Sequence, residues 1–246
     1  MANTPEFGMG ETHTWFAFFD SLAPRLDSFL ATLSDEERER ARRFRFPKDR
    51  DAYVLAQGFL REILSQYVGI AACELRFELG AHGKPFLVEA QSKAHLRFNL
   101  SHAQGAVICA LAHDCEVGVD LEPLREHADA LELSKNYFSE REAIALAGLP
   151  ASERGRAFLT CWTRKEAYIK ARGEGLRMDL KSFEVFGPDE AQPQLRVCGN
   201  PEESHRWTVR DLDVPEGYVA ALVLEGKNCN VKSVVWSGKM EGLNPQ

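Results

Sequence analysis

Apolar and polar residues alternate in several short runs along the first half of this chain. The alternation predicts strands at residues 15–19, 75–79 and 96–100, because side chains of a strand point to opposite faces in turn. The run 107–112 is almost continuously apolar. We therefore expect a strand there that is covered on both faces.

Helix start and stop signals separate these strands. Ser34 is followed three residues later by a glutamate, the capping-box pattern that opens a helix, and Pro47 must end that helix. We expect Asp49 to cap the next helix, which runs from Arg50 to about Tyr67 and stops at Gly69. Apolar residues at helical spacing give this helix one core-facing side.

The second half of the chain replays this order. Ser139 begins another capping box, and a long helix is expected from about Glu153 to Arg172, where Gly173 ends it. Further strands are predicted near residues 182–186, 195–198, 206–211 and 218–224.

The repeat extends to sequence likeness. The two capping serines lie 105 residues apart, and the segment GAVICALA at Gly105 resembles GYVAALVL at Gly217. We predict an α+β fold of two similar halves related by a pseudo-two-fold axis, an N-terminal half at 1–115 and a C-terminal half at 116–246. Since no flexible linker separates them, the halves should pack closely, with a site at their junction.

Composition and charge exclude several classes of protein. The chain has 246 residues, of which 44% are hydrophobic and 27% charged, so collagen, coiled-coil and wholly disordered structures are excluded. A net charge of −7 argues against a nucleic-acid partner. No apolar run approaches the roughly 18 residues needed to cross a bilayer, so we expect no membrane association. The six cysteines form no Cys-x-x-Cys pair, as expected for reduced thiols in a cytoplasmic protein.

The strongest chemical motif is Val-Gly-Val-Asp-Leu-Glu at 117–122. In a strand its three branched apolar residues face a core, whereas Gly118, Asp120 and Glu122 share the opposite face. Two neighbouring carboxylates repel each other, and Mg²⁺, which prefers oxygen ligands, would relieve that repulsion. Gly118 is expected to leave room beside them. The alternative is a strand with one solvated acidic face.

A second motif, at 162–170, lies on the predicted long helix. Glu166 and Lys170 are four residues apart on one face, and Trp162 is one turn earlier on the same face. They can form an ordinary surface ion pair beside a core tryptophan. Alternatively, Glu166 is a third acid that completes a Mg²⁺ site with room for phosphate oxygens.

Two further groups of polar residues suggest anion binding. Ser101 and His102 end a predicted strand, and a hydroxyl beside an imidazole suits an anion, although a structural histidine is the alternative. Lys48 and Arg50 lie at a predicted helix N-terminus, where backbone N–H groups also favour anions. Their alternative is a solvated face of an arginine-rich segment. The chain contains neither a phosphate-binding Gly-x-x-x-x-Gly-Lys-Ser/Thr loop nor a Gly-x-Ser-x-Gly motif.

Taken in order, four motifs resemble those of a known family. They are Gly-Lys-Pro at 83–85, FNLSH ending at His102, GVDLE ending at Glu122 and WTRKEAYIKARGEGL at 162–176. The chain resembles 4′-phosphopantetheinyl transferases of the surfactin-synthetase-activating (Sfp-like) type over about residues 33–225. The resemblance implies a monomer that binds coenzyme A between its halves. It implies holo-[acyl-carrier-protein] synthase activity, in which the phosphopantetheine arm is transferred to a carrier-protein serine and adenosine 3′,5′-bisphosphate is released.

The resemblance also implies roles for individual residues. Asp120, Glu122 and Glu166 match the Mg²⁺ ligands, and Mn²⁺ is expected to substitute. Glu166 matches the base that deprotonates the carrier serine, directly or through a water, with Lys170 and His102 as further catalytic residues. The expected coenzyme A contacts are Lys48 or Arg50 together with His102 at the 3′-phosphate, and Lys84, Pro85, Ser101 and Lys170 elsewhere. Glu37 stands at a position where some relatives carry a basic residue, so this part of the nucleotide contact is not expected to match theirs.

The implied partners are acyl or peptidyl carrier domains of fatty-acid, polyketide or nonribosomal peptide synthases. Two other functions are compatible with the same residues. A Mg²⁺-dependent nuclease would use the same acids and lysine, but the negative net charge argues against it. A non-catalytic module that binds carrier protein or coenzyme A would have no need to retain every acidic position.

Overall fold

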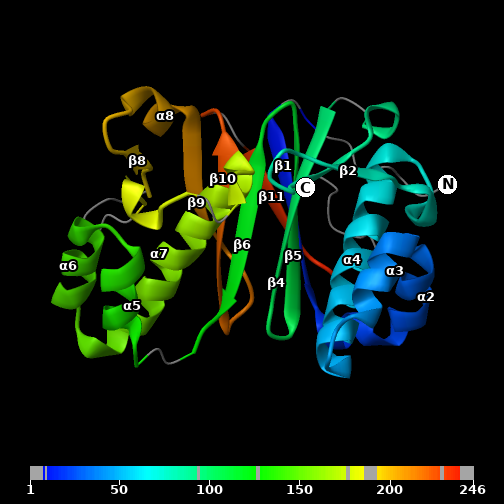
Figure 1. Cartoon of the computed structure of the whole chain (residues 1–246), viewed down its shortest axis with the longest axis horizontal. Helices are drawn as coiled ribbons and strands as arrows, with labels where there is room; N and C mark the ends of the chain where they lie inside the picture. The colour runs from blue at the N-terminus through cyan, green and yellow to red at the C-terminus, as the bar shows by residue number, and fades with distance from the viewer. Residues whose placement is uncertain are drawn as a thin grey trace.

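The computed structural model describes residues 8, 10–92, 95–125, 128–175, 178–185, 193–227 and 230–238. Strands occupy the middle of the molecule, and helices cover both flanks (Figure 1). Leu176 and Phe186, which end a sequence motif and a predicted strand, lie outside the described residues.

The N-terminal half supplies the helices on one flank and most of one sheet. Its elements are β1 (Glu11–Phe18), α1 (Phe19–Leu22), α2 (Leu26–Thr32), α3 (Asp35–Arg42), α4 (Pro47–Val68), the 3-10 turn η2 (Ala72–Glu74), β2 (Phe77–Leu79), β3 (Pro85–Leu87), β4 (Leu96–Ala103) and β5 (Ala106–His113). Two more 3-10 turns, at Ala23–Arg25 and Glu89–Gln91, connect them.

The C-terminal half supplies the opposite flank and a second sheet. Its elements are β6 (Val117–Pro123), α5 (Ala130–Tyr137), α6 (Glu140–Gly148), α7 (Ala151–Arg172), the 3-10 turn η6 (Leu180–Ser182), β7 (Phe183–Glu184), β8 (Arg196–Val197), α8 (Pro201–Arg206), β9 (Trp207–Leu212), β10 (Tyr218–Glu225) and β11 (Asn230–Val235).

Strand order is the same in the two halves. One sheet has the order β11-β1-β5-β4 and the other β6-β10-β9, so β1-β5-β4 corresponds to β6-β10-β9. These strands pair antiparallel, and each half also carries a small two-stranded sheet, β2-β3 or β7-β8. The predicted α+β fold of two similar halves is confirmed. The boundary near residue 115 stays a prediction, and β11, which pairs parallel with β1, crosses it.

The sequence signals for helix ends agree with the structure except at Pro47 and Asp49. Pro47 does not end the helix that Ser34 opens, because α3 already ends at Arg42. Ser34 and Ser139 both form complete capping boxes, and Gly69 and Gly173 end the two 22-residue helices in the left-handed conformation. The prediction that Asp49 caps α4 is wrong. The helix begins three residues earlier than predicted, at Pro47, because the fixed φ of proline suits the first helical position and proline has no N–H to satisfy.

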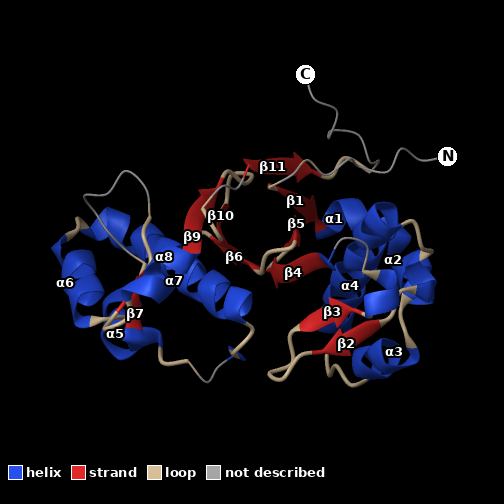
Figure 2. Ribbon diagram, turned by 90° about the horizontal axis from the view of Figure 1, so that it is seen from above, coloured by secondary structure: helices blue, strands red, loops and turns tan. Residues whose placement is uncertain are grey.

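Three apolar cores hold these elements together. One lies under α2 and α4, one surrounds α7, and the third fills the space between the two larger sheets, whose strands stand around it in Figure 2. As predicted, β5 is buried on both faces. Val117, Val119 and Leu121 of β6 point into the central core. Within the described ranges, no helix combines the length and apolar character needed to span a membrane.

Candidate active site

The two larger sheets meet where β4 lies beside β6 (Figure 2). Side chains of β4 bridge this seam. The Asn99 Oδ1 accepts a hydrogen bond from the Val119 N–H at 2.9 Å, and the Ser101 Oγ donates to the Asp120 Oδ1 at 2.9 Å. The register of one half against the other is therefore fixed at two points, and one of them joins Ser101 to Asp120, which the sequence marks as functional.

Lys170 of α7 joins the seam from a third element. Its Nζ lies 2.6 Å from the Asp120 Oδ1 and 3.0 Å from the Ser101 Oγ, and it also reaches the Val119 carbonyl at 3.3 Å. Asp120 is only 5% exposed, whereas the Lys170 side chain is 28% exposed, so the ion pair is shielded from solvent mainly at the carboxylate. The structure thus brings three of the predicted site residues into direct contact.

The second carboxylate oxygen of Asp120, Oδ2, does not take part in these contacts. Among the described residues, no group donates a hydrogen bond to the buried Oδ2. A buried oxygen without a partner carries a large desolvation penalty, so this position suits an additional cation or donor.

Glu122 and Glu166 add two more carboxylates near Asp120. Burial raises the pKa of Glu122, and the negative charge of Asp120 raises it further. Burial and then the charge of Asp120 also raise the pKa of Glu166, whereas Lys170 opposes that rise. The three acids therefore repel one another electrostatically, and Lys170 offsets part of that repulsion. Within the described ranges, however, no three His, Cys, Asp or Glu side chains already form a cluster that could hold a metal ion.

Gly118 explains how α7 comes so close to β6. A Cβ built on Gly118 would lie 2.0 Å from the Ala167 carbonyl oxygen and 2.3 Å from the Ala171 nitrogen. The expectation that this glycine leaves open room beside the acids is wrong, because the backbone of α7 fills the space. The close packing places Glu166 and Lys170 against the acidic face of β6.

Positively charged side chains lie near the C-terminal end of β4, which carries Ser101 and His102. His102 lies there beside Phe19, with ring centroids 6.3 Å apart. Partial burial lowers the pKa of His102, and the charges of Lys170 and Arg40 lower it further. Arg40 itself stacks on the ring of Tyr53. The charges of Lys170 and Arg40 give this side of the site a positive potential suited to an anion, whereas the lowered pKa favours the neutral form of His102.

The remaining predicted contacts lie in different surroundings. Lys48 and Arg50 are exposed in the first turn of α4, where Arg50 pairs with Asp51 at 2.7 Å. The Lys84 Nζ is enclosed, and burial lowers its pKa. It donates to the Glu116 carboxylate at 2.7 Å and to the carbonyls of Val117 and Ala171 at 3.0 and 2.9 Å. Pro85 begins β3. Lys84 thus ties β6 to the last turn of α7.

The sequence reasoning missed two features of this site. Asn99 stands in the FNLSH motif, and as a buried amide on an apolar strand it could have been noticed. A cavity of about 160 Å³ opens beside Glu122, between α5 and α7. Its lining combines apolar side chains with one carboxylate and one guanidinium, from Glu122, Arg125, Leu133, Phe158, Leu159 and Trp162.

The comparisons with known proteins agree on one family. The 4′-phosphopantetheinyl transferase superfamily matches residues 116–223, and the N-terminal region of 4′-phosphopantetheinyl transferase matches residues 20–114. The 4′-phosphopantetheinyl transferase HetI of Nostoc sp. is 34% identical, covering 88% of each chain. The 4′-phosphopantetheinyl transferase Sfp of Bacillus subtilis is 29% identical, covering 80% of this chain and 84% of its own.

Among solved structures, the holo-[acyl-carrier-protein] synthase of Thermotoga maritima is 20% identical, with a TM-score of 0.37, and covers 46% of this chain and 63% of its own. The match to HetI extends over most of both chains. The protein belongs to the 4′-phosphopantetheinyl transferase family.

Proposed function

We propose that this protein transfers the 4′-phosphopantetheine arm of coenzyme A to a serine of an apo acyl or peptidyl carrier protein. The observation that carries this proposal is the joining of Ser101, Asp120 and Lys170 at the seam between the halves, with two more carboxylates beside them. The same family resemblance supports a monomeric, cytoplasmic enzyme that serves carrier domains of fatty-acid, polyketide or nonribosomal peptide synthases.

The donor set fits a divalent cation. The buried Asp120 Oδ2 lacks a partner among the described residues, and Glu122 and Glu166 offer further hard oxygen ligands. These three acids would hold Mg²⁺, or Mn²⁺ in its place. The metal would supply neutralisation of the pyrophosphate charge.

The transfer replaces the phosphoanhydride bond of coenzyme A by a phosphodiester bond to the carrier serine. The carrier serine Oγ forms a bond to the phosphorus that bears the pantetheine arm, and the bond from that phosphorus to the bridging pyrophosphate oxygen breaks. The electron pair of the broken bond leaves with adenosine 3′,5′-bisphosphate. We assign Glu166 as the base that takes the serine proton, since an un-ionised hydroxyl is a weak nucleophile.

Positive side chains would bind the other phosphates. Lys170, with the Ser101 hydroxyl beside it, is suited to the pyrophosphate. His102 would donate an imidazole N–H to the 3′-phosphate, and the contacts of Lys84 and Pro85 with coenzyme A stay predictions. We assign Lys48 or Arg50 to the 3′-phosphate, because both are exposed in the first turn of α4. Phosphoryl transfer depends mainly on this kind of positioning and charge stabilisation.

The test is a transfer assay with the purified protein, coenzyme A, Mg²⁺ and a panel of apo-carrier proteins, read by intact mass. We expect carriers to gain one phosphopantetheine, and carriers whose serine is replaced by alanine to gain nothing. Excess EDTA should abolish the transfer, and added Mg²⁺ should restore it. No mass gain on any carrier, or full activity in EDTA, would contradict the proposal or its metal.

Variants of the acids sharpen the test. Asp120→Ala and Glu166→Ala should each lower kcat by roughly 10²-fold or more, whereas Glu122→Gln should be milder because a water can replace one ligand. Glu78→Ala, which removes an exposed acid on β2, serves as a matched control. Near-native turnover of Glu166→Ala would show that another group is the base.

A further inference from the structure

A buried ion pair anchors the helix that carries Glu166. The Lys165 Nζ lies 2.8 Å from the Glu142 Oε2, and both side chains are almost completely excluded from solvent, at 0% and 1% exposure. The ammonium also donates to the carbonyls of Leu180 and Phe183, at 2.8 and 2.6 Å. Its three hydrogens therefore all have acceptors on segments outside α7.

Glu142 is equally constrained. It is the third residue of α6 and closes the capping box, where its carboxylate accepts a hydrogen bond from the Ser139 N–H at 3.0 Å. Its other oxygen accepts from the Val185 N–H at 2.8 Å. The pair thus connects the start of α6, the middle of α7 and the chain that follows η6.

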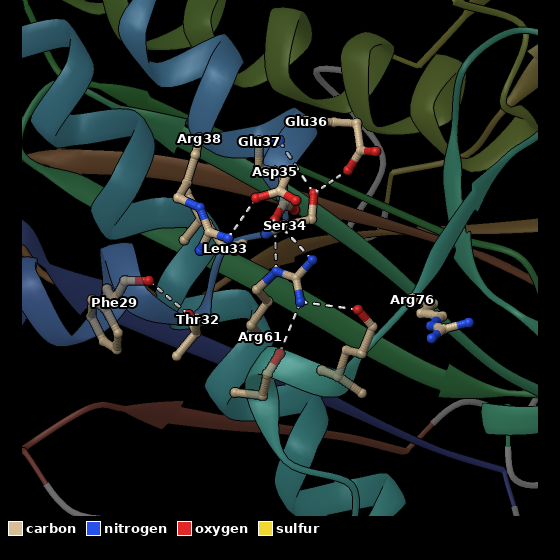
Figure 3. A network of polar contacts seen from close by, with 12 residues as sticks. Phe29, Thr32, Leu33, Ser34, Asp35, Glu36, Glu37, Arg38, Arg61 and Arg76 are labelled. Atoms are coloured by element: carbon tan, nitrogen blue, oxygen red, sulfur yellow. Dashed lines mark hydrogen bonds and ion pairs between the residues drawn. The ribbon is translucent and has the colours of Figure 1, made fainter.

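The N-terminal half contains the same arrangement (Figure 3). There Arg61 of α4 pairs at 2.8 Å with Glu37, the third residue of α3, which closes the capping box of that helix. Its guanidinium donates to the carbonyls of Ala72 and Leu75, at 2.8 and 3.1 Å. Each cation also lies over a phenylalanine ring, Arg61 over Phe77 and Lys165 over Phe183.

The surroundings of the two pairs differ in one functional respect. In the N-terminal half the anchored segment of α4 carries no predicted catalytic group, and Arg61 is buried among structural contacts. In the C-terminal half Lys165 directly precedes Glu166, and Lys170 follows just over one turn later. The opposite side of α7 rests on Gly118 through backbone contacts.

We propose that Lys165 and Glu142 are positioning residues. The buried pair fixes the rotation of α7 about its axis and its position along that axis, and so holds Glu166 and Lys170 against Asp120. This inference rests on the proposed function, because it assigns to the pair the geometry of that reaction. Lys165 points away from the acids, into the core of its own half, and acts only through the helix.

The experiment compares the two pairs with neutral double substitutions. Glu142→Gln with Lys165→Met removes the C-terminal pair, and Glu37→Gln with Arg61→Met removes its N-terminal counterpart. Glutamine preserves the capping box in both, and no buried charge is left unpaired. The swaps Lys165→Arg and Arg61→Lys form a second set, because each introduces the cation that the other half already accommodates.

We expect similar thermal destabilisation from the two double variants but different kinetics. The C-terminal variant should lose roughly 10-fold or more in kcat with a nearly unchanged KM for coenzyme A, since misplacement of about 1 Å can cost 10²-fold. The N-terminal variant should keep its kcat within about twofold. Lys165→Arg should lower kcat in the same way, and Arg61→Lys should not.

Amide hydrogen exchange along α7 provides a readout that needs no turnover. Exchange at residues 162–172 should rise in the C-terminal variants and stay unchanged in the N-terminal ones. The positioning role would be overturned if removal of either pair lowered kcat equally, or if removal of the C-terminal pair left kcat unchanged. In both cases transfer by the wild-type protein would still support the proposed function. A wild-type protein that transfers nothing would instead contradict the proposed function, and the exchange data would then decide whether the pair orders α7.

Discussion

Replacing Gly118 by alanine tests how closely catalysis depends on the packing of α7 on β6. The new Cβ would lie 2.0 Å from the Ala167 oxygen and 2.3 Å from the Ala171 nitrogen, both backbone atoms of the helix. Ordinary van der Waals contact begins at 3.4 Å, so the helix would have to retreat by more than an ångström. No side-chain rotation can relieve such a clash.

The expected cost has two parts. Overpacking of this kind destabilises a protein by about 1–3 kcal/mol, and each kcal/mol lowers the Tm of a chain of this size by about 2–4 °C. The retreat of α7 also carries Glu166 and Lys170 away from Asp120, because all contacts between them cross the same interface. A misplacement of this size should lower kcat by about 10²-fold.

The assay measures transfer to a carrier protein by intact mass, with Tm recorded on the same samples. Gly148→Ala is the matched control, because Gly148 ends α6 and a Cβ there would meet no atom within 4 Å. Alanine at such a helical position should be neutral or stabilising, by up to about 1 kcal/mol. If Gly118→Ala retained wild-type kcat and Tm, the argument that a glycine is required for the approach of α7 would be refuted.

Three further outcomes are expected. Lys48→Ala or Arg50→Ala, whichever removes the 3′-phosphate contact, should reduce the preference in kcat/KM for coenzyme A over dephospho-coenzyme A and leave kcat largely intact. If neither variant changed the ratio of kcat/KM for the two donors, the 3′-phosphate would bind elsewhere. Asn99→Leu leaves the Val119 N–H without its acceptor and should cost about 1–3 kcal/mol in urea unfolding, together with a lower kcat, whereas equal stability would refute the bridging role. Burial lowers the pKa of His13, so at acidic pH the folded protein binds a proton on that ring less readily than the unfolded chain, whose histidine titrates at about 6.5. The unfolding free energy should therefore fall between pH 7 and 5, with a shallower slope in His13→Gln; identical slopes would contradict this.

Local sequence signals determined the helix ends and the faces of the strands. The capping boxes at Ser34 and Ser139, and the stops at Gly69 and Gly173, act through groups only a few residues away. The alternation along 117–122 likewise predicted which residues enter the central core and which form the acidic face. For the same reason, the repeat of these signals predicted two similar halves.

The ordered motifs also anticipated the residues that gather at the site. Asp120, Ser101 and Lys170 were all identified from sequence, and the structure joins them across 19 and 50 residues of chain. The pattern could not say that Lys170 contacts Asp120 directly, or that Asp120 keeps one oxygen without a partner among the described residues. Those facts depend on the distance between α7 and β6, which the single absent Cβ of Gly118 allows to be so short.

Only the tertiary structure decided how distant segments pair. The parallel pairing of β11 with β1 joins residues near the two ends of the described chain. Between β4 and β6, which belong to different sheets, the Asn99 side chain accepts the hydrogen bond of a β6 backbone N–H. The sequence determined the local elements because their signals satisfy neighbouring backbone groups. It left strand partners and buried ion pairs undetermined, since these depend on which groups become close after the cores have packed and on the desolvation that packing imposes.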